Sequence, residues 1–154
     1  MQNNVWIVAH RGASAYAPEN TLTAFQLAWQ MGADGIEGDF RITADGQIVC
    51  FHDASTQRLA RENLTIETSD YATLRSVKIG DAGAHMPLLS EVIATVPRGK
   101  KIFIELKSGP RIVAPLLATL KASDLAADQV ILMTFHAEVL EAIRACTSHY
   151  ATGL

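Results

Sequence analysis

Short apolar runs alternate with helical patterns along the chain, and this alternation most limits the folds open to it. A β-branched-rich run, Val5 to Ala9, comes first, and similar runs recur at residues 102–107 and 130–135. Between such runs, apolar side chains recur at helical spacing, as they do within residues 22–29. Strands separated by helices are typical of α/β folds with a parallel sheet. The sequence therefore predicts an α/β fold in one domain, residues 1–154.

The pattern predicts where the individual elements lie. Strands are expected near residues 5–10, 35–43, 47–53, 102–107, 130–135 and 150–154. The first is apolar throughout from Val5 to Ala9, as expected of a strand buried on both faces. Helices are expected from a cap at Asn20 or Thr21 to Gly32, from Ser69 or Asp70 to Leu74, from a cap at Ser90 through Val96, and over residues 113–120 and 138–146. Residues 79–83 are expected to form a loop.

A predicted hairpin brings an acid close to a histidine. Asp45-Gly46 lies between two segments that alternate with period two, which is a strong turn signal. A two-residue turn sets Asp39 opposite His52, with Cβ atoms about 5 Å apart. A four-residue turn sets Glu37 there instead, and a three-residue turn with a bulge breaks this simple count.

Three carboxylates interrupt strands that are otherwise apolar. Glu37 and Asp39 are two residues apart, so on a strand they point to the same face, and Glu105 belongs to a later strand. Buried carboxylates without partners are costly, and Mg²⁺ or Ca²⁺, which select oxygen ligands, would compensate them. The alternative is that all three are half-exposed and solvated. The pattern indicates a metal site and leaves that alternative open.

Two histidines are candidates for proton transfer. His10 ends the first predicted strand and His52 ends the second arm of the hairpin. Imidazole titrates near neutrality and can pass protons either way, although a lone histidine is more often structural. His85, His136 and His149 lack acidic strand neighbours and are expected to be surface or packing residues.

Two basic residues accompany these groups. Arg11 follows His10, and Lys107 lies two residues after Glu105. The guanidinium fork and the ammonium point charge both suit phosphate oxygens. Plain ion pairs with the neighbouring acids are the alternative, and cations gathered around a metal site favour a phosphate substrate.

Seven short polar motifs follow one another between residues 10 and 107. They are His10-Arg11-Gly12, Pro18-Glu19-Asn20-Thr21, Gly32-Ala33-Asp34, Glu37-x-Asp39, Thr43-x-Asp45-Gly46, His52-Asp53 and Glu105-Leu106-Lys107. A further segment, residues 87–91, is similar to a Pro-x-Leu-x-Glu motif. In this order they resemble the signature of the glycerophosphodiester phosphodiesterases.

The resemblance implies a TIM-type (β/α) barrel that uses a divalent metal to hydrolyse glycerophosphodiesters to sn-glycerol 3-phosphate and an alcohol. By position, it implies metal ligands at Glu37, Asp39 and Glu105, an acid/base pair at His10 and His52, and phosphate contacts at Arg11 and Lys107. Two alternatives stay open: a related barrel phospholipase, and a truncated fragment that binds metal and phosphate without catalysis.

A complete barrel of this type has about 250 residues, more than the 154 of this chain. We therefore expect an incomplete TIM-type barrel with about the first five or six strands. Its unclosed sheet edge favours self-association. An excerpt of a longer protein is the leading explanation, beside completion by a partner or second copy and a vestigial fragment.

Composition excludes some classes of function. The net charge is -3 and no basic run occurs, which argues against nucleic-acid binding. The first apolar stretch is too short for a signal peptide or a membrane span, so a cytoplasmic location is expected. Cys50 and Cys146 have no metal-binding spacing and are expected to be reduced thiols.

Overall fold

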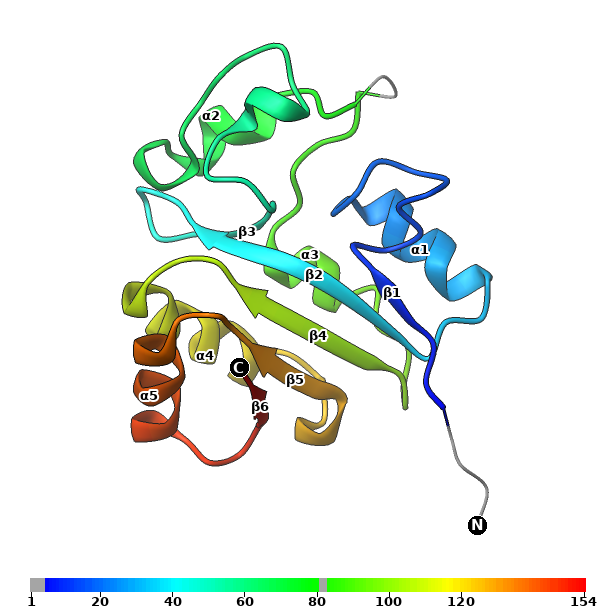
Figure 1. The fold of residues 1–154 in the computed structure, drawn as a ribbon, viewed down its shortest axis with the longest axis vertical. Helices are drawn as coiled ribbons and strands as arrows, with labels where there is room; N and C mark the ends of the chain where they lie inside the picture. The colour runs from blue at the N-terminus through cyan, green and yellow to red at the C-terminus, as the bar shows by residue number, and fades with distance from the viewer. Residues whose placement is uncertain (1–4, 81–82) are drawn as a thin grey trace.

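The computed structural model describes residues 5–80 and 83–154, and shows one sheet with helices behind and beside it (Figure 1). The elements are β1 (Val8–His10), α1 (Leu22–Gln30), β2 (Gly35–Ile42), β3 (Ile48–Cys50), α2 (Tyr71–Ser76), α3 (Leu89–Ile93), β4 (Lys101–Leu106), α4 (Val113–Lys121), β5 (Val130–Met133), α5 (Ala137–Cys146) and β6 (Ala151–Gly153). Within this described part, no helix is both long and apolar enough to cross a bilayer.

The sheet follows the order β1-β2-β4-β5-β6, and all of these neighbours are parallel. β3 is the exception, since it pairs antiparallel with the second half of β2, beyond the stretch that β1 occupies. Strands joined through helices confirm the predicted α/β fold and place the carboxyl ends of β1, β2 and β4 at one edge of the sheet. Those ends position the candidate site.

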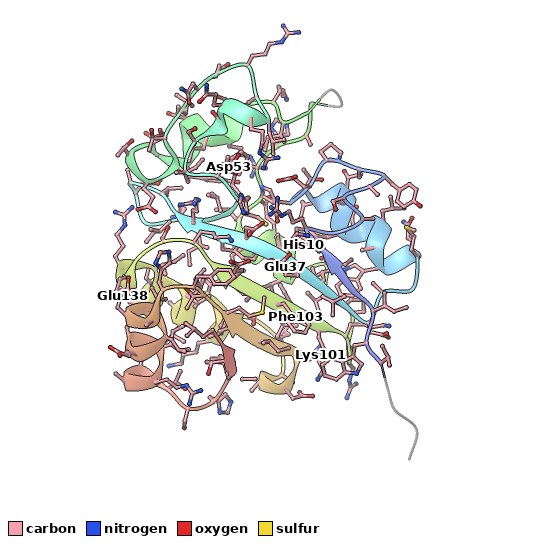
Figure 2. All side chains as sticks on the ribbon, in the orientation of Figure 1. His10, Glu37, Asp53, Lys101, Phe103 and Glu138 are labelled. Atoms are coloured by element: carbon pink, nitrogen blue, oxygen red, sulfur yellow. The ribbon has the colours of Figure 1, made fainter. Side chains whose placement is uncertain are left out.

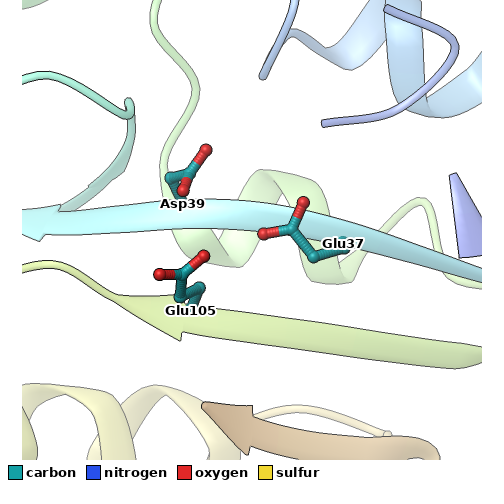
Figure 3. A group of neighbouring side chains, drawn as sticks. All are labelled: Glu37, Asp39 and Glu105. Atoms are coloured by element: carbon teal, nitrogen blue, oxygen red, sulfur yellow. The ribbon is translucent and has the colours of Figure 1, made fainter. Parts of the chain in front are cut away.

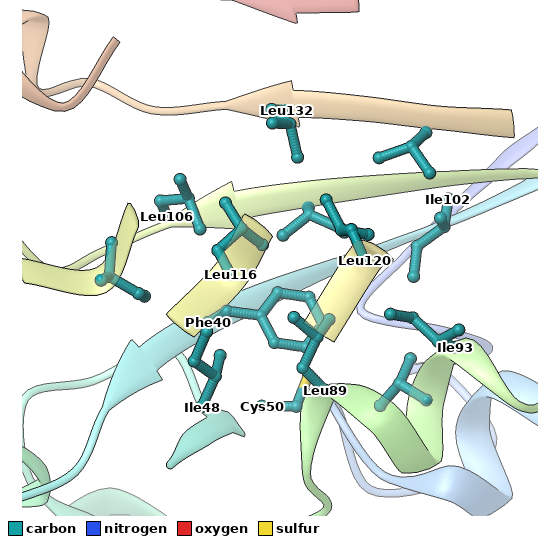
Figure 4. Close-up of a cluster of buried hydrophobic side chains, with 14 of the residues drawn as sticks. Phe40, Ile48, Cys50, Leu89, Ile93, Ile102, Leu106, Leu116, Leu120 and Leu132 are labelled. Carbon is teal, nitrogen blue, oxygen red and sulfur yellow. The ribbon is translucent and has the colours of Figure 1, made fainter. Parts of the chain in front are cut away.

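The main core lies between the sheet and its helices (Figure 4). Ile36 and Phe40 of β2, with Ile104 of β4, are buried in this cluster, where Leu116 and Leu120 of α4 join them. Because side chains alternate along a strand, the residues between these apolar ones point to the face without helices. Glu37, Asp39 and Glu105 all occupy such positions.

A second, smaller core holds the segment between β3 and α3. Its buried members are Val49, Phe51, Ile66, Leu74, Ile79 and Met86. Figure 1 shows this segment folded above β3, next to the end of β2. It fixes the stretch after β3, which contains His52, at the edge of the sheet where the candidate site lies.

The first strand is shorter and more exposed than predicted. β1 begins at Val8, and the side chains of Val5, Trp6 and Ile7 are 82%, 52% and 67% exposed. The prediction of burial on both faces is therefore wrong. These three exposed residues precede β1, which pairs only with β2 among the described strands.

The hairpin has a three-residue turn, so the counts that set Asp39 or Glu37 opposite His52 are wrong. Ile42 pairs with Ile48, and the amide of Thr43 donates to the carbonyl of Gln47, which leaves residues 44–46 as the loop. Gly46 has φ +82° there. β3 ends at Cys50, so His52 lies beyond the strand that was expected over residues 47–53.

The helices lie close to their predicted ranges, with one wrong cap. Thr21 caps α1 and Asp70 caps α2. Ser90 caps nothing, because α3 already begins at Leu89, where the Glu91 carboxylate accepts the Leu88 amide at 2.8 Å. α3 also ends at Ile93, before Val96. Of the loop expected at residues 79–83, residues 81–82 lie outside the described part of the chain.

Candidate active site

The three predicted carboxylates converge on the face of the sheet that carries no helices. Asp39 of β2 is the register neighbour of Glu105 of β4, and Glu37 precedes Asp39 by two residues on the same face (Figure 3). One oxygen from each lies within 4.8 Å of the others. Glu37 and Asp39 are only 5% and 0% exposed, so the alternative of half-exposed, solvated acids does not hold for these two.

Glu37 is the least compensated member of the cluster. One of its oxygens, Oε2, accepts the backbone amide of Arg11 at 3.0 Å, whereas Oε1 is buried with no hydrogen-bond partner among the described residues. Burial, helped by the charges of Asp39 and Glu105, raises the pKa of Glu37 to about 7. Three converging carboxylates with an unpartnered oxygen fit a hard cation that prefers oxygen ligands.

Asp39 is held by Asn20, which the sequence offered as a possible helix cap and as part of the Pro18-Glu19-Asn20-Thr21 motif, without a role at the site. The Asn20 amide nitrogen donates to Asp39 Oδ2 at 2.9 Å, and its oxygen accepts the Asp39 amide at 3.2 Å. Asn20 is buried and has φ +58°, a conformation that asparagine tolerates better than most residues. Thr21 caps α1. An asparagine directly before the capping threonine was the sequence signal that Asn20 has another role.

The two predicted phosphate binders lie at the cluster and pair with its acids. Arg11 Nε is 3.2 Å from Asp39 Oδ2, and Lys107 Nζ is 3.2 Å from Asp39 Oδ1. Neither of these two ion pairs has the geometry of a hydrogen bond. Lys107 also donates to Glu105 Oε1 at 2.5 Å. The structure thus shows the ion pairs that the sequence left open, and the phosphate role stays a prediction.

The two predicted proton-transfer histidines occupy different surroundings. His10 ends β1 beside Glu37 (Figure 2), with Nε2 3.8 Å from Oε2 of that residue and a side chain that is 68% exposed. His52 places Nδ1 2.7 Å from Asp53 Oδ1. The other three histidines, His85, His136 and His149, are exposed, as expected.

Three further charged residues connect segments of the site, and the sequence did not predict this role for them. Arg41 donates through Nε to the His52 carbonyl at 2.9 Å and through Nη1 to the Lys107 carbonyl at 3.4 Å. Its position two residues after Asp39 on β2 could have flagged it. Glu19 and Arg58 pair across the site, 39 residues apart, and no local pattern announces such a contact.

The sequence has relatives of named function. A model described as the glycerophosphoryl diester phosphodiesterase family matches residues 10–154. A probable glycerophosphodiester phosphodiesterase 1 of Mycobacterium tuberculosis is 34% identical over 163 residues, which cover 90% of this chain and 60% of that protein. A glycerophosphodiester phosphodiesterase of Caldanaerobacter subterraneus subsp. tengcongensis is 33% identical over 161 residues, 96% and 65% of the two chains.

Solved structures of the same kind share the fold. The structure of a phosphodiesterase of Oleispira antarctica in complex with the product sn-glycerol-3-phosphate has a TM-score of 0.89 and 28% identity, covering 97% of this chain and 65% of that one. A glycerophosphodiester phosphodiesterase of Thermotoga maritima has a TM-score of 0.82 and 30% identity, covering 99% and 63%. The chain thus spans 60–65% of the length of these four relatives.

The fold is an incomplete TIM-type barrel with a parallel sheet, and it is similar to 60–65% of the length of these relatives. The family match covers all seven motifs noted in the sequence and continues through β6. On this evidence the chain belongs to the glycerophosphoryl diester phosphodiesterase family.

Proposed function

We propose that the protein containing this chain hydrolyses glycerophosphodiesters to sn-glycerol 3-phosphate and an alcohol. The observation that carries the proposal is the convergence of Glu37, Asp39 and Glu105, in which Glu37 Oε1 is buried and has no hydrogen-bond partner among the described residues. The family match and the product complex of the Oleispira antarctica relative support this substrate class.

The proposed metal ligands are Glu37, Asp39 and Glu105, and the proposed ion is Mg²⁺ or Ca²⁺, because all three residues offer carboxylate oxygens. When bound, such a cation supplies positive charge that polarises a phosphate oxygen and lowers the pKa of a hydroxyl group. Asn20 contributes by keeping the Asp39 carboxylate in one orientation.

The proposed proton transfers involve His10 and His52. His10 takes the proton of the glycerol 2-hydroxyl as that oxygen attacks phosphorus, and His52 gives a proton to the alcohol oxygen as its bond to phosphorus breaks. Water then opens the resulting cyclic phosphate by the reverse exchange of protons. The reverse assignment of the two histidines makes the same prediction for their alanine variants.

Arg11 and Lys107 are the proposed phosphate contacts. Both cationic side chains are mostly buried at the cluster, with 19% and 17% of their surfaces exposed, and they contact different oxygens of Asp39. Their charges would offset those of the phosphodiester, while the guanidinium fork of Arg11 orients it.

The test is release of sn-glycerol 3-phosphate from glycerophosphocholine, with and without EDTA. EDTA should abolish release, and His10→Ala or His52→Ala should each lower turnover about 10²-fold while cation binding persists. His149→Ala, at an exposed histidine away from the cluster, serves as the control. Near-normal turnover in either active-site variant would refute the histidine assignment.

A second candidate follows from the 60–65% coverage of the relatives. The chain by itself would then bind Mg²⁺ or Ca²⁺ and sn-glycerol 3-phosphate without turnover. Isothermal titration of both ligands, run beside the turnover assay, separates the two functions. Release of phosphorylated headgroups from phospholipid vesicles would instead identify the third candidate, a barrel phospholipase.

A further inference from the structure

Arg58 joins the two segments that carry the site's histidines. It ends a short 3₁₀ turn (Thr56–Arg58) in the segment after β3. Its Nη2 and Nη1 donate to Glu19 Oε1 and Oε2 at 2.6 and 3.2 Å, so both oxygens of that carboxylate are engaged. Its Nε donates to Asp53 Oδ2 at 2.7 Å. One guanidinium therefore ties the loop between β1 and α1 to the segment that follows β3.

Asp53 passes this constraint to His52. Its second oxygen, Oδ1, lies 2.7 Å from His52 Nδ1. The hydrogen bond from Arg58 is the main cause that lowers the pKa of Asp53, so this carboxyl stays ionised and can only accept. An ionised acceptor at this distance requires a hydrogen on Nδ1, so Nε2 is the nitrogen that takes up a proton and, in the acid role proposed above, gives it to the leaving alcohol.

We propose that Arg58 is a positioning residue that, through Asp53, holds the His52 ring in one orientation with its proton on Nδ1. Its place in the reaction rests on the acid/base role proposed above for His52. Arg41 fixes the backbone of the same histidine by donating to its carbonyl. Between them, the two arginines hold the main chain and the ring of His52.

The contacts continue from Arg58 to the metal-ligand cluster. Glu19 Oε1 also accepts from Arg11 Nη1 at 3.0 Å, and Arg11 Nε lies 3.2 Å from Asp39. His52 and the carboxylates are thereby linked through one run of charged side chains. His10 has only Glu37, at 3.8 Å, as an ionic partner among the described residues, so His52 is the histidine with the preset ring.

This role is distinct from a contribution to folding. The Arg58 side chain is 44% exposed, and ion pairs at that exposure add little to stability. A residue that only stabilised the loop would leave the state of the His52 ring unchanged when it was replaced. The tautomer of His52 is therefore the property that tests the proposal.

The experiment uses the 154-residue chain labelled with ¹⁵N-histidine, at a pH where imidazole is neutral. Two-bond ¹H–¹⁵N spectra should show His52 with its proton on Nδ1 in the unmodified protein. Arg58→Gln should move the ring toward the Nε2-protonated form, and Arg58→Lys should restore the original form only in part, because one ammonium cannot bridge Asp53 and Glu19. Arg61→Gln, three residues along the same segment at an exposed arginine, should change nothing.

Asp53→Asn keeps the shape of the side chain but removes its charge, so it should give the same change if Arg58→Gln fails to fold. An unchanged His52 tautomer in whichever of these variants folds would overturn the proposal. In protein that shows turnover, Arg58→Gln should lower kcat about tenfold or more with KM within about threefold. A rise in KM alone would also overturn it, whereas a tautomer change without any turnover in the unmodified chain would count against the proposed function instead.

Discussion

The folded structure destabilises the ionised form of the Glu37 carboxyl. This carboxyl is 5% exposed, two acids face it, and its pKa is raised to about 7 from an ordinary value of 4.5. The folded state therefore favours the protonated form. The stability that this gives is complete below pH 4.5 and is lost as the pH rises through 7.

The first prediction concerns this pH dependence. In EDTA, the free energy of unfolding of the unmodified protein should fall relative to that of Glu37→Gln as the pH rises from 4.5 past 7. The total difference should be on the order of 3 kcal/mol. Urea unfolding at stepped pH measures it, with Glu141→Gln, at an exposed acid on α5, as the control. Parallel curves for the unmodified protein and Glu37→Gln would contradict the burial argument.

Asn20 leads to the second prediction. Asn20→Ala removes both hydrogen bonds to Asp39 and leaves its buried Oδ2 with only the Arg11 ion pair, which should cost about 1–3 kcal/mol of stability. Because partners that orient a ligand also affect metal affinity, Ca²⁺ binding should weaken about tenfold or more. Denaturant unfolding and isothermal titration measure the two effects. Asn63→Ala, at an exposed asparagine, should match the unmodified protein in both, and equal Ca²⁺ affinity in Asn20→Ala would remove Asn20 from the site.

At the scale of elements, two glycines with similar backbone angles separate conformational strain from steric contact. Gly12 follows β1 with φ +78°, and Gly46 lies in the β2–β3 turn with φ +82°. A Cβ on Gly46 would meet nothing within 4 Å, whereas a Cβ on Gly12 would lie 2.6 Å from the backbone of Ala24 in α1. Only a side chain at Gly12 would force a helix, α1, to move.

The third prediction follows from this pair. Gly46→Ala should cost about 1 kcal/mol, the ordinary penalty for a left-handed residue. Gly12→Ala should cost clearly more, because it forces α1 away from the loop whose Arg11 amide binds Glu37. Denaturant unfolding of both variants measures the difference. Equal losses would show that the loop after β1 can yield without moving α1.

The hairpin shows what local sequence can and cannot predict. Asp45-Gly46 correctly predicted a turn, but its length depends on residues far along the chain. The Ala44 amide donates to the Ser69 carbonyl at 2.9 Å, and Asp45 Oδ1 accepts the Tyr71 amide at 3.0 Å. These contacts come from the segment between β3 and α3. The alternation of apolar and polar residues within the hairpin therefore cannot predict them.

The site shows the same division. Spacing alone placed Glu37 and Asp39 on one face, since strand geometry sets that relation. That Glu105 adjoins Asp39 required the order of the strands in the sheet. The bridge from Arg58 to Glu19 required the complete fold, because it connects two loops through side chains only.

At the scale of the whole molecule, the number of strands agrees with the length of the relatives. Five of the described strands run parallel, and a TIM-type barrel has eight. Five eighths is close to the 60–65% of each relative that the chain covers. β1 and β6 each have one parallel neighbour among the described strands. Among the described elements, no helix covers the face of the sheet that carries Glu37, Asp39 and Glu105.

The last prediction concerns this open sheet, where we propose that copies of the chain associate. Ile131 alternates with the buried Val130 and Leu132 of β5, so it points to the face without helices, as Phe103 and Met133 do. Apolar side chains beside an unpaired strand edge favour pairing with another chain. Sedimentation velocity should therefore show association that grows with concentration.

Ile131→Lys should weaken this association, because a charge on that face must be desolvated at the contact, whereas Ala145→Lys, at an exposed position on α5, should not. A chain that stays monomeric at all concentrations would show that the open face is stable in water by itself.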